Sequence, residues 1–194
     1  MTFHRLASAG LLAAIAGSAV ANELANEFEP ALRQLAETEL APALADPALV
    51  AAIRAQNTRN AGLSEPEIVA LDEEWRASVG GGSTLIEGVI GRPEANTLRA
   101  LREGSAGLLT EVFVMDAVGL NVAASDVTSD FWQGDEAKWQ ETFLVGPGTV
   151  HVSTVDFDES TQTYQSQVSL TVADPETGEA IGAATFGVNV AYLE

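Results

Sequence analysis

Cysteine is absent from this chain of 194 residues, and histidine occurs only twice. The absence of cysteine excludes disulfides, thiolate metal sites and cysteine nucleophiles. The two histidines, His4 and His151, do not have the spacing of a His-x-x-x-His metal site. No Gly-x-Ser-x-Gly motif supports a serine nucleophile, and the glycine-rich segment at 80–84 lacks the lysine of a phosphate-binding loop. We therefore expect no enzyme activity, no metal site and no cofactor.

Basic residues are also scarce. The chain has 9 lysines and arginines against 28 aspartates and glutamates, and a formal net charge of -19. A nucleic-acid partner needs a basic surface to meet the phosphates, so the composition excludes that class of protein. Hydrophobic residues make up 46% of the chain, which suits a globular core and excludes a wholly disordered protein.

Long apolar runs are missing except near the N-terminus. His4 and Arg5 precede an apolar run at residues 6–20, which is followed by Ala21 and polar residues. This is the pattern of a secretory signal peptide, and it predicts a signal peptide over residues 1–21 with cleavage after Ala21. The alternative is an uncleaved membrane anchor, for which the run is short and rich in alanine and glycine. We expect a soluble protein exported to the periplasm.

Prolines divide the predicted helical region, residues 22–107, into several helices. Pro30, Pro42 and Pro47 exclude a single rod, because proline is tolerated in a first helical turn and ends a helix elsewhere. Asp46 followed by Pro47 predicts the start of one of these helices.

Capping and glycine signals mark further helices in the same region. The segment 64–67, Ser-Glu-Pro-Glu, has capping-box spacing and predicts a helix that ends at the three glycines at 80–82. Residues 93–103 predict another helix with leucines facing inward. Residues 83–92 are ambiguous.

Strands dominate the rest of the chain, residues 108–194. Apolar, β-prone segments are separated by turn sequences rich in glycine, proline and aspartate. Helices followed by strands predict an α+β fold, with N-terminal helices preceding a five-stranded antiparallel sheet and a short helix that covers it. The expected strands are 111–116, 120–125, 149–156, 164–172 and 180–191.

The covering helix is expected within residues 130–143, where aromatic and charged residues are crowded together. Gly134 interrupts the run and Asp135 is a good N-cap residue. We therefore expect a short helix that starts at Asp135 and is bracketed by Glu136 and Glu141.

The aromatic residues of this stretch are candidates for the roof of a pocket. Trp139 and Phe143 are four residues apart and share one face of the expected helix. A helix that crosses the sheet would place Phe131, Trp132 and Trp139 over a small pocket. The alternative is that the three aromatic side chains cap the hydrophobic core.

Alternation along the last two long strands gives further candidate contacts. Gln167 and Thr185 lie on polar faces, whereas Val168 and Phe186 point the opposite way, so one face forms the core and the other can form a pocket. For Thr185 and Asn189 the alternative is an exposed sheet face. The full set of candidate ligand-binding residues is Phe131, Trp132, Lys138, Trp139, Tyr164, Gln167, Thr185 and Asn189.

Two other groups of polar residues are interpreted as structural. His151 is expected on a strand face. Asp156, Asp158 and Glu159 could coordinate a hard cation, but they lack the regular loop with its distal glutamate, so we prefer an acidic hairpin.

Three motifs between about residues 111 and 190 follow one another in a recognisable order. They are the hairpin Val114-Met115-Asp116-Ala117-Val118-Gly119 followed by Val122-Ala123-Ala124-Ser125, the pair Phe131-Trp132 before the Trp139 helix, and Val172-Ala173-Asp174 with Gly178-Glu179-Ala180-Ile181-Gly182. With this order of elements the chain resembles the extracytoplasmic Cache sensor domains (PDC, PAS-like) of bacterial chemoreceptors and sensor kinases. The resemblance implies a PAS-like sheet that binds a small ligand on one face under a loop-and-helix cover, with binding shifting the N-terminal helices between two arrangements.

Two departures from this family pattern bear on function. Members that signal directly have a transmembrane helix after the domain, and this sequence stops at Glu194, so we expect signalling through a partner. Members that bind amino acids have a basic residue beside the tryptophan of the cover, and the segment Asp-Phe-Trp-Gln at 130–133 offers none.

These observations give a leading hypothesis and two alternatives. The leading one is a soluble periplasmic sensor module that binds a small ligand and signals through a membrane receptor or sensor kinase, with homodimerisation through the N-terminal helices. The alternatives are a non-catalytic interaction or assembly protein and a cation-binding protein. Between Glu103 and Glu194 the only basic residues are Lys138 and His151, so we expect a neutral or cationic ligand, such as an amine, a quaternary ammonium compound or a purine-like ring.

Overall fold

The computed structural model describes residues 26–158 and 162–193. The predicted signal peptide and Glu159 lie outside these ranges. The helices are α1 (Glu29–Leu35), the π-helix η1 (Ala36–Leu40), α2 (Ala41–Ala43), α3 (Pro47–Asn60), α4 (Glu65–Ser78), α5 (Thr84–Ile90), α6 (Pro93–Gly104), α7 (Ala137–Gln140) and the 3-10 helix η2 (Val190–Tyr192). The strands are β1 (Leu109–Met115), β2 (Asn121–Ala124), β3 (Val150–Val152), β4 (Asp156–Asp158), β5 (Thr163–Ala173) and β6 (Ala180–Asn189).

Local capping explains where the N-terminal helices begin. The Asp46 carboxylate accepts hydrogen bonds from the first free N–H groups of α3, and Pro47 occupies the first helical turn. At α4 the Glu67 carboxylate accepts from the Ser64 backbone N–H at 2.8 Å and from its hydroxyl at 2.6 Å. Both predicted starts are confirmed. The ambiguous residues 83–92 form α5, and the Ser83 hydroxyl accepts from the Ile86 N–H at 3.2 Å.

The sheet is antiparallel, in the order β2-β1-β6-β5-β3, and β4 also pairs with β5. The predicted α+β class is confirmed, but the expected strand 149–156 is divided into β3 and β4, so six strands replace five. The division occurs where the Ser153 hydroxyl accepts the Gln167 N–H at 2.8 Å and draws the chain out of the regular ladder. The last strand ends at Asn189, whose side chain caps η2.

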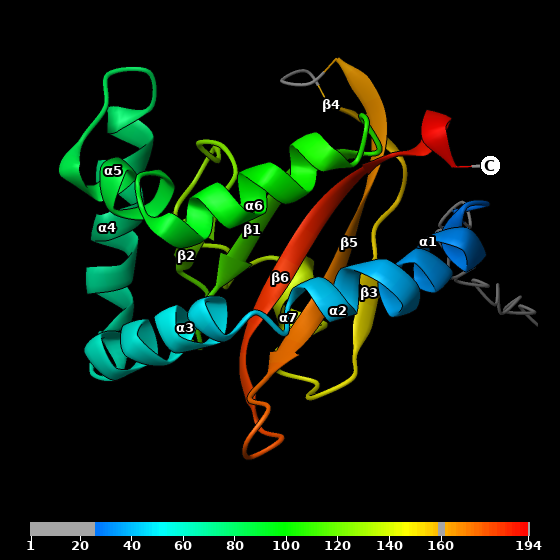
Figure 1. Cartoon of the computed structure of the whole chain (residues 1–194). Coiled ribbons are helices and arrows are strands. Elements are labelled where there is room, and N and C mark those ends of the chain that lie inside the picture. Colours follow the sequence, from blue (N-terminus) through cyan, green and yellow to red (C-terminus); the bar gives the residue numbers. More distant parts are fainter. Residues whose placement is uncertain (1–25, 159–161, 194) are drawn as a thin grey trace, which may run out of the picture.

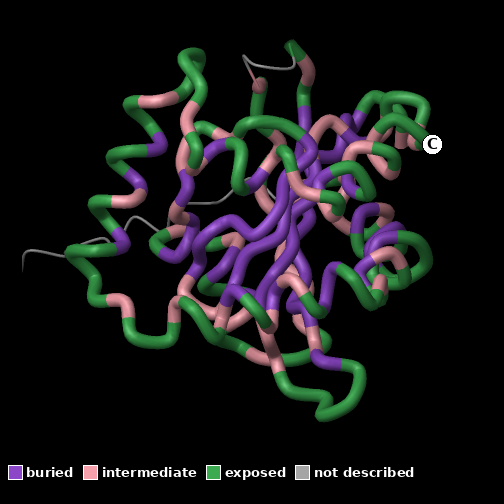
Figure 2. The backbone as a smooth tube through the Cα atoms, turned by 60° about the vertical axis from the view of Figure 1, so that its left-hand side comes forward, coloured by how far each residue is buried: buried purple, intermediate pink, exposed green. Residues whose placement is uncertain are grey.

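Each face of the sheet carries a separate hydrophobic cluster. On one face α1 to α3 and α6 pack against alternate residues of β1, β5 and β6, and they lie in front of the sheet in Figure 1. Val168 and Phe186 belong to this cluster, as their alternation predicted. On the other face α4, α5 and α7 pack near Phe113 and Met115. The buried backbone is accordingly concentrated in the central strands (Figure 2).

The short helix α7 is found where the sequence predicted it, one residue out of register at its start. Its N-cap is Glu136 and its C-cap is Glu141, whereas Asp135 was the expected cap. The start is later because the Glu136 N–H donates to the Gln133 carbonyl at 3.1 Å, which closes a turn before the helix. In residues 26–158 and 162–193, no helix combines the length and the apolar character that crossing a bilayer requires.

Candidate functional site

A cavity of about 520 Å³ lies against the sheet face opposite the α1–α3 layer. We call it the sheet cavity. Its floor is β1 and β5, its sides are α7 and β4, and its cover is the loop at residues 126–134. The side chains that line it are Val79, Glu111, Phe113, Val127, Thr128, Ser129, Asp130, Gln133, Lys138, Asp158, Gln165 and Gln167.

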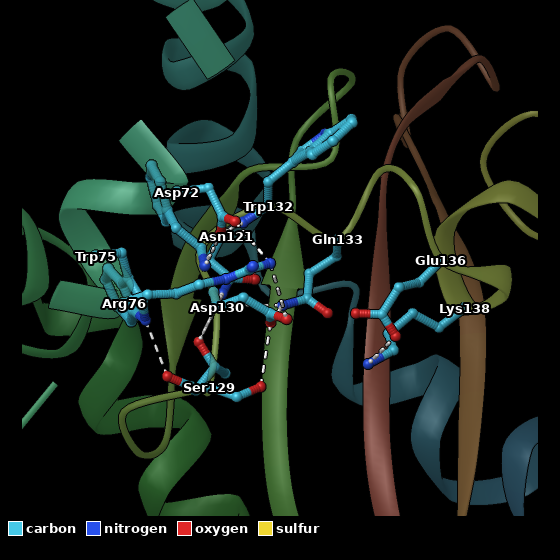
Figure 3. Close-up of polar contacts among 12 residues, drawn as sticks. Asp72, Trp75, Arg76, Asn121, Ser129, Asp130, Trp132, Gln133, Glu136 and Lys138 are labelled. Atoms are coloured by element: carbon cyan, nitrogen blue, oxygen red, sulfur yellow. Dashed lines mark hydrogen bonds and ion pairs between the residues drawn. The ribbon is translucent and has the colours of Figure 1, made fainter. Parts of the chain in front are cut away.

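Helix α4 holds the cover loop in place. The buried Asp72 carboxylate accepts hydrogen bonds from the backbone N–H groups of Phe131 and Trp132, at 2.8 and 3.0 Å. One turn along, Trp75 stacks on the Phe131 ring with 5.2 Å between centroids. Its indole N–H donates to a carbonyl of the same loop. These contacts fix a segment without regular secondary structure over the cavity (Figure 3).

Arg76 adds an electrostatic link between α4 and the cover. Its guanidinium lies 2.7 Å from the Asp72 carboxylate and 3.8 Å from the carboxylate of Asp130, which lines the cavity. Its side chain is 56% exposed, so solvent screens both ion pairs. A ligand that contacts Asp130 therefore contacts a carboxylate that is paired with Arg76 of α4.

Three carboxylates from three different segments face the sheet cavity: Glu111, Asp130 and Asp158. Glu111 accepts from the Gln167 amide at 3.1 Å, and Asp158 accepts from the Gln165 amide at 2.9 Å. Burial raises the pKa of Glu111 above the usual value for a glutamate. The Gln167 hydrogen bond and the positive charge of Lys138 oppose this rise in the pKa of Glu111, while the nearby Asp158 and Asp126 carboxylates add to it.

The only basic side chain among the described lining residues is Lys138. Its ammonium lies 3.0 Å from the Glu136 carboxylate and 5.4 Å from the centroid of the Phe113 ring. The side chain is 13% exposed, so this ion pair is largely shielded from solvent. The positive charge at the wall is therefore already balanced, and the three lining carboxylates leave the cavity acidic.

Gln133 brings an unpaired acceptor to the cavity wall. The residue is 1% exposed, and its amide N–H₂ donates to the Asp130 carbonyl at 3.2 Å and to the Asp130 carboxylate. Its Oε1 has no hydrogen-bond partner among the described residues. A buried amide oxygen without a donor is unfavourable, because it has lost water and gained nothing in exchange.

Of the eight side chains predicted to bind ligand, Lys138 and Gln167 line the sheet cavity. Thr185 lies beside it on the same sheet face, fully buried, and shares a hydrogen bond of 2.9 Å with Ser169. The structure does not bring the other five to the cavity.

Two predicted aromatic roof residues contact the β1–β2 turn instead. The Trp132 indole donates to the Val118 carbonyl at 3.0 Å, and the Trp139 indole donates to the Asp116 carbonyl at 3.1 Å. Trp139 also stacks on Phe143, as their spacing predicted, with 5.1 Å between centroids. Since Phe131 packs on α4, none of the three predicted roof residues lines the sheet cavity.

Tyr164 and Asn189 lie away from the sheet cavity. Tyr164 is 61% exposed and packs edge-on against Phe157 of β4. Asn189 lines a separate shallow hollow with Arg102 and Tyr192, and its side chain accepts from the Ala191 N–H at 3.1 Å.

Sequence reasoning did not place Glu111 or Asp130 at a ligand site, and it considered Asp158 only as a possible cation ligand before preferring an acidic hairpin. Glu111 and Asp158 come from strands 47 residues apart in the chain, and no local motif marks their convergence. A weak signal was present at Asp130 and Gln133, because both lie in the stretch singled out for its aromatic residues. The alternation that selected Gln167 also places Gln165 on its face, and both line the cavity.

A second cavity of about 500 Å³ lies on the other side of α7, between α1 and β3. Its charged side chains neutralise one another. Glu29 pairs with Arg33 at 2.8 Å, and the Glu141 carboxylate lies 2.9 Å from His151 Nδ1. None of the described residues that line the second cavity has a buried side-chain acceptor without a partner, so the sheet cavity is the stronger candidate site.

The described part of the chain has no place where three or more histidine, aspartate or glutamate side chains converge to hold a metal ion. Asp156 accepts from the Thr154 hydroxyl at 2.9 Å, and Asp158 faces Gln165. Glu159, the third residue of the predicted acidic hairpin, lies outside the described residues.

No family model and no curated protein matches this chain. Solved structures similar to it include the ligand-binding domain of the Campylobacter jejuni chemoreceptor Tlp3 in complex with 4-methylisoleucine, with 12% identity and a TM-score of 0.42 over 86% of this chain and 61% of that one. The extracellular domain of a protein described as a histidine kinase, rpHK1S-Z16, has 19% identity and a TM-score of 0.43 over 84% and 61% of the two chains. The sensor domain of the V. cholerae histidine kinase DctB has 11% identity and a TM-score of 0.37 over 84% of this chain and 58% of that one.

These neighbours are sensor and ligand-binding domains of chemoreceptors and histidine kinases, the class of protein that the order of elements resembled. The chain spans about three fifths of their length. At these identities and TM-scores the likeness identifies neither a ligand nor a partner. Function is therefore inferred from the chain's own side chains.

Proposed function

We propose that this protein is a non-catalytic sensor module that binds a small neutral or cationic ligand in the sheet cavity. The observation that supports this most directly is the charge of the cavity wall. Glu111, Asp130 and Asp158 line it, and the only lining cation among the described residues, Lys138, is paired with Glu136. The cavity thus attracts positive charge.

A carboxylate ligand fits this wall poorly. Carboxylates are usually held by a bidentate arginine or by several aimed N–H donors. Among the described residues no arginine lines the sheet cavity, and the Lys138 ammonium would have to leave Glu136. The three lining carboxylates would also repel a negative ligand at short range.

Signalling through the N-terminal helices is the second part of the proposal. In this proposal the chain divides into a helical region at 22–107 and a sheet domain at 108–194. Hydrogen bonds of Asp72 and Trp75 in α4 fix the cover loop to the helical region. A ligand that displaces or tightens the cover would bias the position of α4. Homodimerisation through the helical region would carry that change to a second chain.

Export and a membrane partner complete the proposal. The pattern at residues 1–21 supports export to the periplasm. From there, a change in α4 would be read by a membrane receptor or sensor kinase. The alternatives are an interaction or assembly protein, which would need no ligand, and a protein that binds inorganic cations.

A thermal-shift screen tests the proposal. The purified protein is heated with small amines, neutral ring compounds, carboxylates and divalent cations. A ligand at 100 times its Kd stabilises the folded state by about 2.7 kcal/mol, which raises the melting temperature. We expect a rise with amines or neutral compounds, and the Glu111→Gln variant should reduce the rise for an amine.

The matched control is Glu103→Gln, which makes the same change of charge at a residue with a side chain 65% exposed and outside the sheet cavity. It should leave the amine response unchanged. A rise with carboxylates alone would contradict the charge of the ligand. No response to any organic compound would favour the interaction protein, and a response to divalent cations alone the cation-binding protein.

A further inference from the structure

We infer that the ligand of the sheet cavity is a cation carrying N–H groups, such as a primary ammonium, an amidinium or a guanidinium, and that Gln133 Oε1 accepts one of its hydrogen bonds. This inference rests on the proposed function and narrows it. The acidic wall would attract a protonated amine and a quaternary ammonium ion equally, whereas an acceptor at Gln133 Oε1 favours the protonated amine.

The orientation of the Gln133 amide is set by its neighbours. Its N–H₂ faces two acceptors of Asp130, the backbone carbonyl and the carboxylate. Turning the amide over would place its oxygen against both, so the amide nitrogen must face Asp130. Oε1 therefore points away from Asp130, toward the side on which Glu136 and Lys138 lie (Figure 3).

No described group can satisfy Oε1 in this orientation. The residue is 1% exposed, lines the sheet cavity, and has no donor at Oε1 in the described part of the chain. Lys138 is the basic side chain among the described lining residues, but its ammonium is engaged with Glu136 at 3.0 Å. A ligand N–H is the group that would remove the cost of this open acceptor.

The aromatic groups of the region do not favour a quaternary ammonium ion. Such ions are recognised by several ring faces that surround the positive charge. Phe113 is the aromatic residue among the described lining residues, and the Lys138 ammonium already lies 5.4 Å from the centroid of its ring. Trp132 and Trp139 are bound to the β1–β2 turn. The wall offers acceptors in place of an aromatic cage.

Positive charge on the ligand follows from the neighbours of Gln133. The Asp130 carboxylate adjoins the amide, and its nearest described cation, Arg76, is 3.8 Å away and largely exposed. Glu111 lies in the same wall with its raised pKa. An N–H-bearing cation can neutralise these carboxylates and donate to Oε1 at once, which a permethylated cation cannot do.

A methylation series tests the inference by calorimetric titration of the unaltered protein. The probes are ethanolamine, putrescine and agmatine, together with choline and the bis-trimethylammonium analogue of putrescine. A hydrogen bond to a charged donor is worth roughly a tenfold change in affinity or more. We expect each N–H-bearing probe that has a permethylated analogue to bind at least about tenfold tighter than that analogue.

Equal or tighter binding of the permethylated probes would overturn the inference and leave the proposed cationic site standing. Binding of carboxylates in place of all the cations would overturn the inference together with the proposed ligand charge. An absence of binding by every organic compound tested would overturn the proposed function, and the inference with it.

The variant Gln133→Leu tests the role of the acceptor. It keeps the size of the side chain and removes Oε1, so the advantage of ethanolamine over choline should fall by roughly tenfold or more. The control is Thr171→Val, which removes another buried side-chain oxygen without a partner among the described residues, at a position outside the sheet cavity. It should leave the ratio unchanged. If the Gln133→Leu protein folds, as judged by its melting curve, and keeps the full ratio of ethanolamine to choline affinity, the assignment to Oε1 is overturned. If the variant does not fold, the methylation series on the unaltered protein is the decisive test.

Discussion

Glu111 both lines the sheet cavity and is partly shielded from solvent. It lines the cavity at the start of the β1–β6 pairing, and burial raises its pKa. Because a raised pKa means that the folded protein disfavours the ionised form, the cost of ionising Glu111 is present at neutral pH. A cation bound beside Glu111 would lower the free-energy cost of ionising it, so this carboxylate favours the binding of positive charge.

The pH dependence of stability should carry this signature. The contribution of Glu111 to folding is fully present below the pKa of an unfolded glutamate, about 4.3, and is lost as the pH rises through the higher folded value. The Glu111→Gln variant should therefore lose less stability than the unaltered protein between pH 4 and neutral pH. Urea denaturation at a series of pH values measures this difference.

Glu67 provides the opposite case as a control. Its hydrogen bond from the Ser64 hydroxyl lowers its pKa, so its contribution is present above the unfolded value and is lost as the pH falls. Glu67→Gln should weaken the protein at neutral pH relative to acid. Parallel curves for Glu111→Gln and Glu67→Gln would contradict both assignments.

Among the structural elements, the cover loop and the β1–β2 turn approach each other more closely than side chains would permit. A Cβ on Gly134 would lie 2.3 Å from the Trp132 indole nitrogen and 2.9 Å from the Val118 carbonyl oxygen. Gly119 on the facing turn has φ +85°, and a Cβ there would lie 2.5 Å from Gly134. Two glycines thus allow the backbones to touch.

Substitution at this contact should destabilise the fold. We expect Gly134→Ala to cost about 1–3 kcal/mol of unfolding free energy, because the ring and the loop must both shift. The control is Gly88→Ala, inside α5, where an added Cβ meets no atom within 4 Å. It should stabilise by up to about 1 kcal/mol, because alanine is the better helix former. A neutral Gly134→Ala in chemical denaturation would mean that the contact is looser than described.

Neighbouring residues of α7 should separate packing from binding. Trp139 is 8% exposed, stacks on Phe143 and donates to the β1–β2 turn, so Trp139→Ala should cost roughly 3–5 kcal/mol. Lys138 lines the cavity beside it, and Lys138→Met should keep most of the stability while it strengthens amine binding, since a like charge leaves the wall. Denaturation and titration of the two variants measure this contrast, and weaker amine binding by Lys138→Met would contradict the assigned role of the lysine.

Local sequence signals explain which elements were predictable. The helix starts at Asp46, Pro47 and Ser64 depend on contacts with residues no more than one helical turn away. Their positions could therefore be predicted from the sequence alone. The faces of β5 and β6 follow from a period of two, which no distant contact alters. By contrast, the direction of the Trp132 and Trp139 side chains depends on carbonyls of the β1–β2 turn, which the sequence places far from the aromatic stretch.

The candidate site was harder to predict for the same reason. Lys138 and Gln167 were selected because each lies in a recognisable pattern, and both line the sheet cavity. Glu111, Asp130 and Asp158 are brought together by the order of the strands and by the path of the cover loop. Neither can be inferred from the types of these residues. The split of the third expected strand likewise depends on one hydrogen bond from β5 to the Ser153 hydroxyl.

At the scale of the whole molecule, α3 is fastened to the far end of the β5–β6 hairpin. Arg54 makes a bidentate contact with Asp174, and it also lies 3.3 Å from Glu176. Asn57 on the same helix donates to the Ile181 carbonyl at 2.7 Å. The hydrogen bond from Arg54, together with backbone N–H groups of the turn, lowers the pKa of Asp174 to about 2.

Acid should therefore loosen the helical layer from the sheet. The contribution of Asp174 is present above the pKa of an unfolded aspartate, about 3.9, and is lost as the pH falls toward 2. Arg54→Met should lower stability at pH 7 and shrink the loss between pH 4 and pH 2. Thermal melts of the two proteins across this range test it, and an unchanged acid loss in Arg54→Met would show that Asp174 is not its source.

The cover loop also closes one edge of the sheet. β2 is the outermost strand on its side, yet the Asn121 N–H donates to the Phe131 carbonyl at 3.0 Å and the Gln133 N–H donates to the Gly119 carbonyl at 2.8 Å. A strand edge with free N–H and carbonyl groups invites pairing with another chain and leads to aggregation. The loop therefore covers the start of β2, at Asn121, where another chain could otherwise pair. A ligand that lifted the loop would expose that edge, so high concentrations of the loop-open state should be prone to fibril formation.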